Sequence, residues 1–152
     1  MSWKIGNRII HFNEIDSTNS YLKSNHELLQ QHGLVVRTDM QTSGRGRASR
    51  KFVSLPGQNL TFSVVLHPRK HVSEIQIYSL LASVVVARVL KNYLNSIRVK
   101  WPNDVIVSQK KICGILLETI SIPEQNFPIL IIGIGLNTKG SPKDYPDELR
   151  NI

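Results

Sequence analysis

Residues 97–120 read IRVKWPNDVIVSQKKICGILLETI, and this stretch decides the fold class. Ile97–Trp101 alternates between apolar and polar residues, as a strand does, and stops at a proline, which cannot donate to a strand ladder. Val105–Val107 and Ile112–Ile120 predict two further strands. The polar residues Ser108–Lys111 between them are typical of a hairpin connection. Neighbouring antiparallel strands therefore dominate the second half of the chain.

The remaining elements do not alternate regularly as βαβ units. The hydrophobic pattern predicts strands at Arg8–Ile15, Leu34–Thr38, Asn59–His67 and Phe127–Leu136. One helix is expected between a capping run at residues 16–19 and the glycine at position 33, and a short one is possible at residues 145–152. The longest helix is expected from Ser73, and we expect deep burial against a sheet because it is apolar over more than half its surface. This order predicts an α+β fold, with a mixed, mostly antiparallel sheet and helices on one face.

The composition is that of one globular domain with a preference for anionic partners. The chain has 152 residues, 41% of them hydrophobic and 20% charged, with a formal net charge of +8 and pI ≈ 9.9. Cys113 is its single cysteine, so no internal disulfide is possible. No signal peptide is evident, and the most apolar runs are shorter than the roughly 20 residues that span a bilayer. We therefore expect a cytoplasmic protein with no membrane association.

One loop concentrates the charge. Residues Gln41–Phe52 read QTSGRGRASRKF, without a hydrophobic period. Its glycines allow a ligand to approach the main chain, and its arginines carry donor forks that suit phosphate and carboxylate. The loop is therefore a candidate anion-binding loop. A solvated basic loop and a nucleic-acid contact are the alternatives.

Three more polar or glycine-containing clusters follow predicted strands. They are Asp16–Asn19, Lys100–Asp104 together with Lys111–Gly114, and Gly133–Asn137. Each has an ordinary explanation, such as a helix cap, a turn or a strand end. Because clusters at the ends of adjacent strands can converge, we expect one site.

These clusters, taken in order, resemble the signature motifs of biotin–protein ligases. The motifs are Ser17–Asn19, then Gly44–Arg47 (GRGR), Lys100–Asp104 (KWPND), Lys111–Leu116 (KICGIL) and Gly133–Asn137 (GIGLN). Both their order and their spacing match, and the resemblance covers nearly the whole chain, from about Phe12 to Asn137. It implies the α+β fold that class II aminoacyl-tRNA synthetases share with lipoate ligases.

The resemblance also implies a two-step reaction. Biotin and ATP give biotinyl-5'-AMP and pyrophosphate, and a lysine of a biotin carboxyl carrier protein then attacks the mixed anhydride. ATP and biotin would be substrates, with Mg2+ as cofactor. The carrier domain of a biotin-dependent carboxylase would be the partner, a homodimer is possible, and no specific DNA binding is expected.

Site residues follow from the same motif positions. Adenylation joins two anions, so its main demand is for cations and N–H donors around the α-phosphate. Lys111 and Arg45 are the catalytic candidates, although a hairpin lysine such as Lys111 can also be merely solvated. The biotin-binding candidates are Ser17, Thr18, Asn19, Gln41, Gly44, Arg45, Gly46, Arg47, Trp101, Lys111 and Gly114. The candidates for ATP or the adenylate are Arg45, Arg47, Arg50, Phe52, Asn103, Lys111 and Asn137, with Asn103 and Asp104 as metal ligands.

The chain departs from the family pattern in the loop and at its C-terminal end. Ser49 and Phe52 stand where the family usually has glycine and tryptophan. Residues 1–152 would form the ligase catalytic domain, either truncated or short, without the C-terminal SH3-like barrel and without an N-terminal helix-turn-helix domain. Ordinary core packing is the alternative for Trp101. A lipoate or octanoate ligase or transferase and a basic nucleic-acid-binding module remain as alternative functions.

Overall fold

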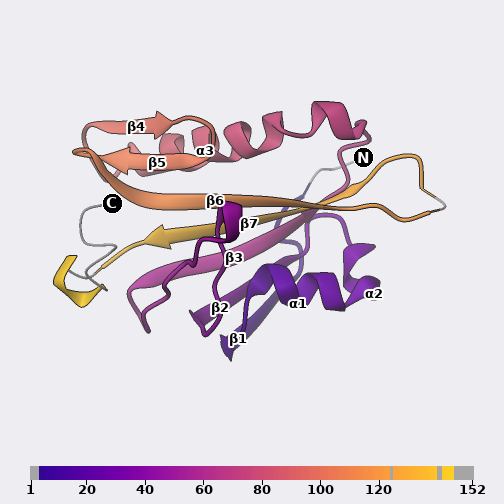
Figure 1. The fold of residues 1–152 in the computed structure, drawn as a ribbon, viewed down its shortest axis with the longest axis horizontal. Coiled ribbons are helices and arrows are strands. Elements are labelled where there is room, and N and C mark those ends of the chain that lie inside the picture. The colour runs from indigo at the N-terminus through magenta and orange to yellow at the C-terminus, as the bar shows by residue number, and fades with distance from the viewer. Residues whose placement is uncertain (1–3, 124, 140–141, 146–152) are drawn as a thin grey trace.

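A single twisted β-sheet forms the centre of the molecule, with strands in the order β1-β2-β3-β7-β6-β5-β4 (Figure 1). The computed structural model describes residues 4–123, 125–139 and 142–145. The strands are β1 (Ile9–Ile15), β2 (Val35–Gln41), β3 (Asn59–Leu66), β4 (Ile97–Lys100), β5 (Asp104–Val107), β6 (Lys110–Ile120) and β7 (Ile129–Asn137). The helices are α1 (Thr18–Ser24), α2 (His26–Leu29) and α3 (Ile77–Leu90), and short 3-10 turns lie at Arg47–Ser49, Val72–Glu74 and Pro142–Asp144.

The strand pairing confirms the α+β prediction. β1 and β2 are parallel and are connected through α1 and α2, whereas every other neighbouring pair is antiparallel. Ser108 and Gln109 connect β5 to β6 with positive φ angles of 49° and 69°. This geometry matches the right-handed twist of the strands it joins, and it forms the predicted hairpin. The helix that was possible at residues 145–152 falls mostly outside the described residues.

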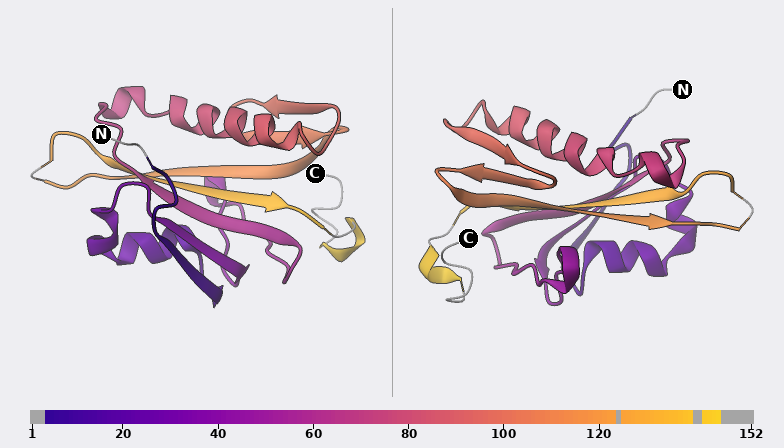
Figure 2. Two further views of the ribbon diagram at one scale, coloured as in Figure 1. Left: turned by 180° about the vertical axis from the view of Figure 1, so that it is seen from behind. Right: turned by 45° about the horizontal axis from the view of Figure 1, so that its top comes forward.

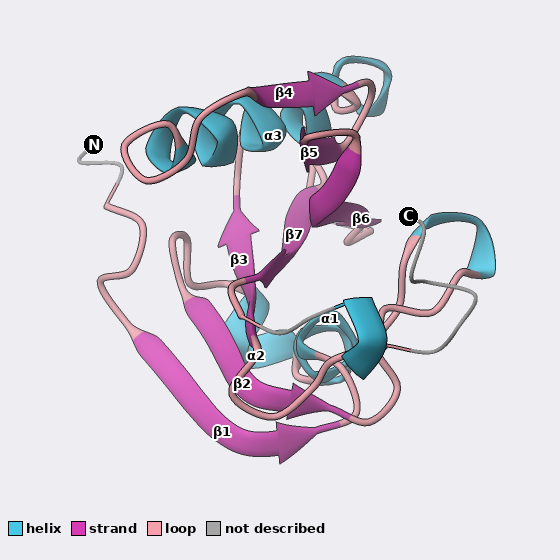
Figure 3. Cartoon of the chain, turned by 90° about the vertical axis from the view of Figure 1, so that its left-hand side faces the viewer, coloured by secondary structure: helices cyan, strands magenta, loops and turns pink. Residues whose placement is uncertain are grey.

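Helices lie on both faces of the sheet, so the prediction of one covered face is wrong. α1 and α2 pack on one face, over a core that includes Leu22, Leu29 and Val65, and α3 packs on the other with β4 and β5 beside it (Figure 2). Figure 3 shows the sheet turning from β1 and β2 at one side to β4 next to α3. The strands of the sheet centre are apolar on both faces, since Ile131 belongs to one core and Ile132 to the other.

Deep burial of the long helix is also a wrong prediction. α3 directs its small residues Ser79, Ser83 and Ala87 toward the sheet, at a spacing of four residues. Tyr78, Val86 and Leu90 pack partly buried against the core, whereas Leu81 and Val85 lie outward and are 49% and 61% exposed. Small side chains let the helix approach the sheet closely, and the apolar residues beside them stay half-exposed. Residues 72–90 are long and apolar enough for a membrane span by composition, but α3 contacts β4, β5 and β6.

The start of α1 is set by its capping residue. Ser17 adopts an extended conformation, and its hydroxyl accepts a hydrogen bond from the Ser20 amide. The predicted single helix is interrupted at Asn25, which ends α1 and precedes α2. Gly33 then has φ +81°, and a Cβ there would meet the Lys4 carbonyl, so glycine is needed before β2. Because the cap at Ser17 starts α1 at the next residue, Thr18 and Asn19 lie in its first turn, over the sheet.

Candidate functional site

The sheet face beneath α1 carries a floor of small and polar residues. In the strand register, Ser63 of β3 pairs with Gly133 of β7, and Gly135 of β7 pairs with Gly114 of β6. Residues two apart on a strand share a face, so these positions lie together. Three of these positions are glycines, whose missing side chains leave room above the sheet. Side chains from other elements occupy this room. A Cβ at Gly133 would meet Asn19 Oδ1 at 2.5 Å.

A buried hydrogen-bond network joins the predicted biotin contacts above this floor. Gln41 Oε1 accepts from the Thr18 amide at 2.9 Å and lies 3.1 Å from the Thr18 hydroxyl. The Ser63 hydroxyl lies 2.6 Å from that of Thr18 and 2.5 Å from Asn19 Oδ1. Strands β2 and β3 and helix α1 thus supply one network. Ser17 is buried beside it, with its side chain engaged in the helix cap.

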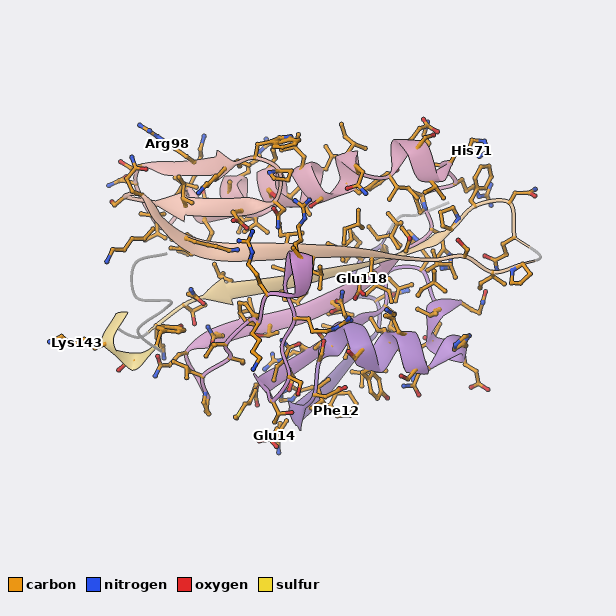
Figure 4. All side chains as sticks on the ribbon, viewed as in Figure 1. Phe12, Glu14, His71, Arg98, Glu118 and Lys143 are labelled. Carbon is orange, nitrogen blue, oxygen red and sulfur yellow. The ribbon has the colours of Figure 1, made fainter. Side chains whose placement is uncertain are left out.

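Glu118 completes the network, and the sequence prediction missed it. Its Oε2 accepts from Asn19 Nδ2 at 2.9 Å and from Arg45 Nη2 at 2.8 Å, and its Oε1 accepts from Lys23 Nζ at 3.1 Å. Glu118 is labelled in Figure 4. Partial burial alone would raise the pKa of Glu118. The hydrogen bonds from Asn19 and Lys23, with the charges of Arg45 and Lys23, outweigh it and lower that pKa below its ordinary value. Glu118 is therefore ionised at neutral pH.

Two signals in the sequence could have found the missed residues. Glu118 is the one acidic residue of the apolar strand β6, and it lies four residues after Gly114, on the same face. Ser63 and Thr61 occupy alternate positions of β3, facing the same way, and both are buried. Thr61 Oγ1 has no hydrogen-bond partner among the described residues. A buried hydroxyl without a partner is costly, and a ligand can satisfy it.

The glycine–arginine loop closes on itself over this face. The Gly46 amide donates to the Arg50 carbonyl, and the Phe52 amide donates to the Gly44 carbonyl. Between them, Arg47–Ser49 forms a 3-10 turn in which Ala48 has φ 51°, a left-handed conformation that favours glycine. Ala48 precedes Ser49, the position where the family usually has glycine. Arg45 donates to Glu118 and Arg47 donates to Asn103. Arg50 is exposed.

Lys111 lies on the same face as the floor, at the β5–β6 end. The β5–β6 register slips between Val105 and Ile106, which leaves an extra residue in β6 and re-aims the side chains there. Lys111 Nζ lies 2.7 Å from Asp104 Oδ1, and a Cβ at Gly114 would lie 3.1 Å from Lys111 Nζ. Gly114 thus lets the lysine side chain lie along the strand, which agrees with the close approach that the sequence indicated.

Asn103 and Asp104 already have protein partners. Asn103 Oδ1 accepts from Arg47 Nη1 at 3.0 Å, and its amide donates to the Ile115 carbonyl at 2.8 Å. Asp104 pairs with Lys111. Within the residues that the structure describes, no group of three His, Cys, Asp or Glu could hold a metal ion. These side chains therefore do not fit a magnesium site made by the protein alone.

The remaining candidates differ in their surroundings. The Phe52 ring lies against Gly135, where any Cβ would collide with it, so this glycine is needed for the ring to reach the sheet. Asn137 Oδ1 accepts from Asn59 Nδ2 at 2.8 Å. Trp101 is 78% exposed, which rules out the core-packing alternative. Burial raises the pKa of the Cys113 thiol to about 12, so it is not a nucleophile at neutral pH.

The family follows from a match to this same region. Residues 11–137 match the model of the biotin/lipoate A/B protein ligase family. The chain belongs to that family. The match includes every strand described above except the first two residues of β1, and all of the hydrogen-bond network.

Individual members of the family agree in sequence and in fold. The bifunctional ligase/repressor BirA of Bacillus subtilis is 36% identical over 97% of this chain and 46% of its own length. A biotin protein ligase from Aquifex aeolicus, solved in complex with biotin and ATP, is 32% identical over 95% of this chain and 57% of that chain, with a TM-score of 0.76. One from Leishmania major, in complex with biotinyl-5-AMP, is 25% identical over 95% of this chain and 64% of that chain, with a TM-score of 0.73. The chain spans about half the length of the relatives it matches.

Proposed function

We propose that this chain carries the adenylation site of a biotin–protein ligase, which activates biotin with ATP to biotinyl-5'-AMP and passes biotin to a lysine of a biotin carboxyl carrier protein. The observation that carries the proposal is the convergence of polar groups and cations over the glycine floor. Solved relatives bind biotin with ATP, or biotinyl-5-AMP, on the same fold.

The network offers donors and acceptors that suit a cyclic urea. A ureido group presents one acceptor and two donors, and the hydroxyl of Thr18 and the amides of Asn19 and Gln41 are matching partners. They are buried and already hydrogen-bonded, so little side-chain entropy is lost when they bind a ligand. Ser17, Gly44, Gly46 and Trp101 remain proposed contacts around them.

Three cations serve the charged end of the substrates. Arg45, Arg47 and Lys111 each pair with a protein oxygen, on Glu118, Asn103 and Asp104 respectively. An arginine has five N–H donors and a lysine three, so donors remain for the biotin carboxylate and the α-phosphate. Fixed cations reduce the repulsion between two anions as they join, and they stabilise charge at phosphorus. Arg50, Phe52 and Asn137 remain proposed contacts on the nucleotide side.

Magnesium would enter with ATP. Mg2+ commonly binds through substrate phosphates and waters with only one or two carboxylates. Asn103 and Asp104 do not form a preset site, and we assign no step to the metal. A cytoplasmic location without membrane or specific DNA binding, and a possible homodimer, belong to the same proposal.

Biotin-dependent exchange of pyrophosphate into ATP tests adenylation directly. The expected result is exchange with biotin and none without it, together with measurable heat of biotin binding. Absence of both exchange and binding would reject the proposal for this chain. Biotin transfer to a purified carrier domain is a separate assay, because adenylation and transfer are separate steps.

The family includes lipoate ligases, so substrate choice needs its own comparison. Further relatives carry the name of biotin ligases, which favours biotin as the substrate. Replacing biotin with lipoate or octanoate in the exchange assay is expected to abolish exchange. A nucleic-acid-binding module would instead show salt-sensitive binding to oligonucleotides of any sequence.

A further inference from the structure

Glu118 is the charged group around which the network is arranged. Its side chain is 18% exposed, and three side chains from α1 and the loop converge on it. Asn19 and Lys23 lie one helical turn apart on α1, whereas Arg45 comes from the loop. One carboxylate on β6 thus fastens two separate segments to the sheet.

An ionised carboxylate also determines which way the hydrogen bonds run. It can only accept, so Asn19 must direct its NH2 group to Glu118 and its carbonyl oxygen to Ser63. The Ser63 hydroxyl has one hydrogen, and because Asn19 Oδ1 can only accept, Ser63 donates there. The Thr18 hydroxyl lies 2.6 Å from that of Ser63 and 3.1 Å from Gln41 Oε1, which can only accept, so its one hydrogen is not assigned by Glu118. A single direction runs from Ser63 through Asn19 to Glu118.

We propose that Glu118 is a positioning residue for the biotin site: it fixes the hydrogen-bond direction of Asn19 and Ser63, and it holds Arg45 over the floor. The proposal rests on the function proposed above. Glu118 orients these groups in the ligand-free protein as well. Both oxygens of Glu118 accept hydrogen bonds from protein side chains. Its effect on biotin passes through the groups that it orients.

Glu118→Gln is the test variant, because it keeps the shape, removes the charge and adds a donor that can face Asn19. Glu74→Gln is the matched control: Glu74 is an exposed carboxylate that pairs with Lys70 at 3.0 Å. In the ligand-free protein, hydrogen exchange of the Gly46 and Phe52 amides, which close the loop, is expected to be faster in Glu118→Gln only. Amides of β3 and α3 should exchange as in the wild type.

The effect of Glu118 on biotin binding is measured by calorimetry and by the kinetics of biotin-dependent pyrophosphate exchange. Loss of a charge-assisted hydrogen bond predicts that Glu118→Gln weakens biotin binding by about tenfold or more. KM for biotin should rise by a larger factor than KM for ATP, because Asn19 is assigned to biotin alone and Arg45 to both substrates, a split that general loss of structure would not produce. Asn19→Asp, which sets two carboxylates against each other, should also weaken binding. The double variant Asn19→Asp/Glu118→Gln should lose less than the product of the two single effects, because the new amide on β6 can donate to the new carboxylate on α1.

The two proposals fail in different ways. Unchanged exchange of the loop amides in Glu118→Gln overturns the positioning role, whatever happens with biotin. So does a wild-type biotin affinity in Glu118→Gln. If the wild type binds no biotin but Glu118→Gln still releases the loop, then the proposed function is wrong and the positioning of Arg45 stands.

Discussion

Lys111 and Lys110 are adjacent lysines at the start of β6, and they provide a matched pair. Lys111 is two-thirds buried against Asp104, whereas Lys110 is exposed at the hairpin turn. Removing one preorganised group that stabilises transition-state charge costs about 100-fold or more in rate. Lys111→Ala should therefore lower biotin-dependent pyrophosphate exchange by about that factor. Lys110→Ala should keep wild-type exchange, and equal activity of the two variants would remove Lys111 from the site.

Arg47 connects the loop to Asn103 and is expected to retain the adenylate. A lost charge-assisted hydrogen bond corresponds to about 1.5–3 kcal/mol, so Arg47→Ala should speed release of biotinyl-5'-AMP by about tenfold or more. Release is measured by trapping labelled adenylate in excess unlabelled ligand. Arg98→Ala, at an exposed arginine of β4, is the control. Identical release rates in wild type and Arg47→Ala would contradict the clamp.

At the element scale, β7 tests whether the loop rests on the sheet through Phe52. A Cβ at Gly135 would collide with the Phe52 ring, so Gly135→Ala is expected to destabilise the protein by about 1–3 kcal/mol. Phe52→Ala removes the obstacle, and Gly135→Ala should then cost much less in the double variant. Urea unfolding of the four proteins measures the coupling. Additive effects would mean that the ring does not lie against this strand.

Helix α3 gives a second test, of which face meets the sheet. Ser83 is fully buried and donates to the Ser79 carbonyl, while Val85 is 61% exposed. Ser83→Leu should destabilise the protein by about 1–3 kcal/mol through overpacking. Val85→Lys, in spite of its charge, should stay within about 0.5 kcal/mol. The opposite ranking in thermal or urea unfolding would reverse the assigned orientation of the helix.

The errors of the sequence prediction lie at this scale. Strand positions were predicted within a few residues because alternation reports burial locally, as in β3 and β6. The apolar surface of α3 indicated burial but not its direction, which the small residues Ser79, Ser83 and Ala87 determine. Helices on two faces follow from the parallel β1–β2 pair and from β4 curling beside α3, and both depend on contacts distant in sequence.

The candidate site shows the same division. Motif positions supplied Thr18, Gln41 and Lys111, which the fold brings to one face of the sheet. Glu118 and Ser63 were missed because an acidic residue or an alternate pair of hydroxyls in an apolar strand indicates a polar face without identifying what it contacts. Their roles appear only when register places them under α1.

At the scale of the whole molecule, Glu118 makes stability depend on pH. Its folded pKa lies below the ordinary value of 4.5, so its contribution is present above pH 4.5 and is lost as the pH falls through the folded pKa. Asp39 and Glu74 also have lowered pKa values, through hydrogen bonds from His11 and Lys70 respectively, but both are exposed. Salt screens exposed pairs far more than partly buried ones.

Acid unfolding in about 0.5 M salt should therefore isolate Glu118, because the Debye length is then well below its value of about 10 Å at 0.1 M. The free energy of unfolding of the wild type is expected to fall more steeply below pH 4.5 than that of Glu118→Gln, whose side chain cannot titrate. Above about pH 6 the two curves should run parallel, with the variant lower because Lys23 and Arg45 lack their partner. Asp39→Asn should follow the wild-type slope. Parallel curves across the whole range would show that Glu118 is not held ionised by its three neighbours, and would remove the charge on which the direction of the network depends.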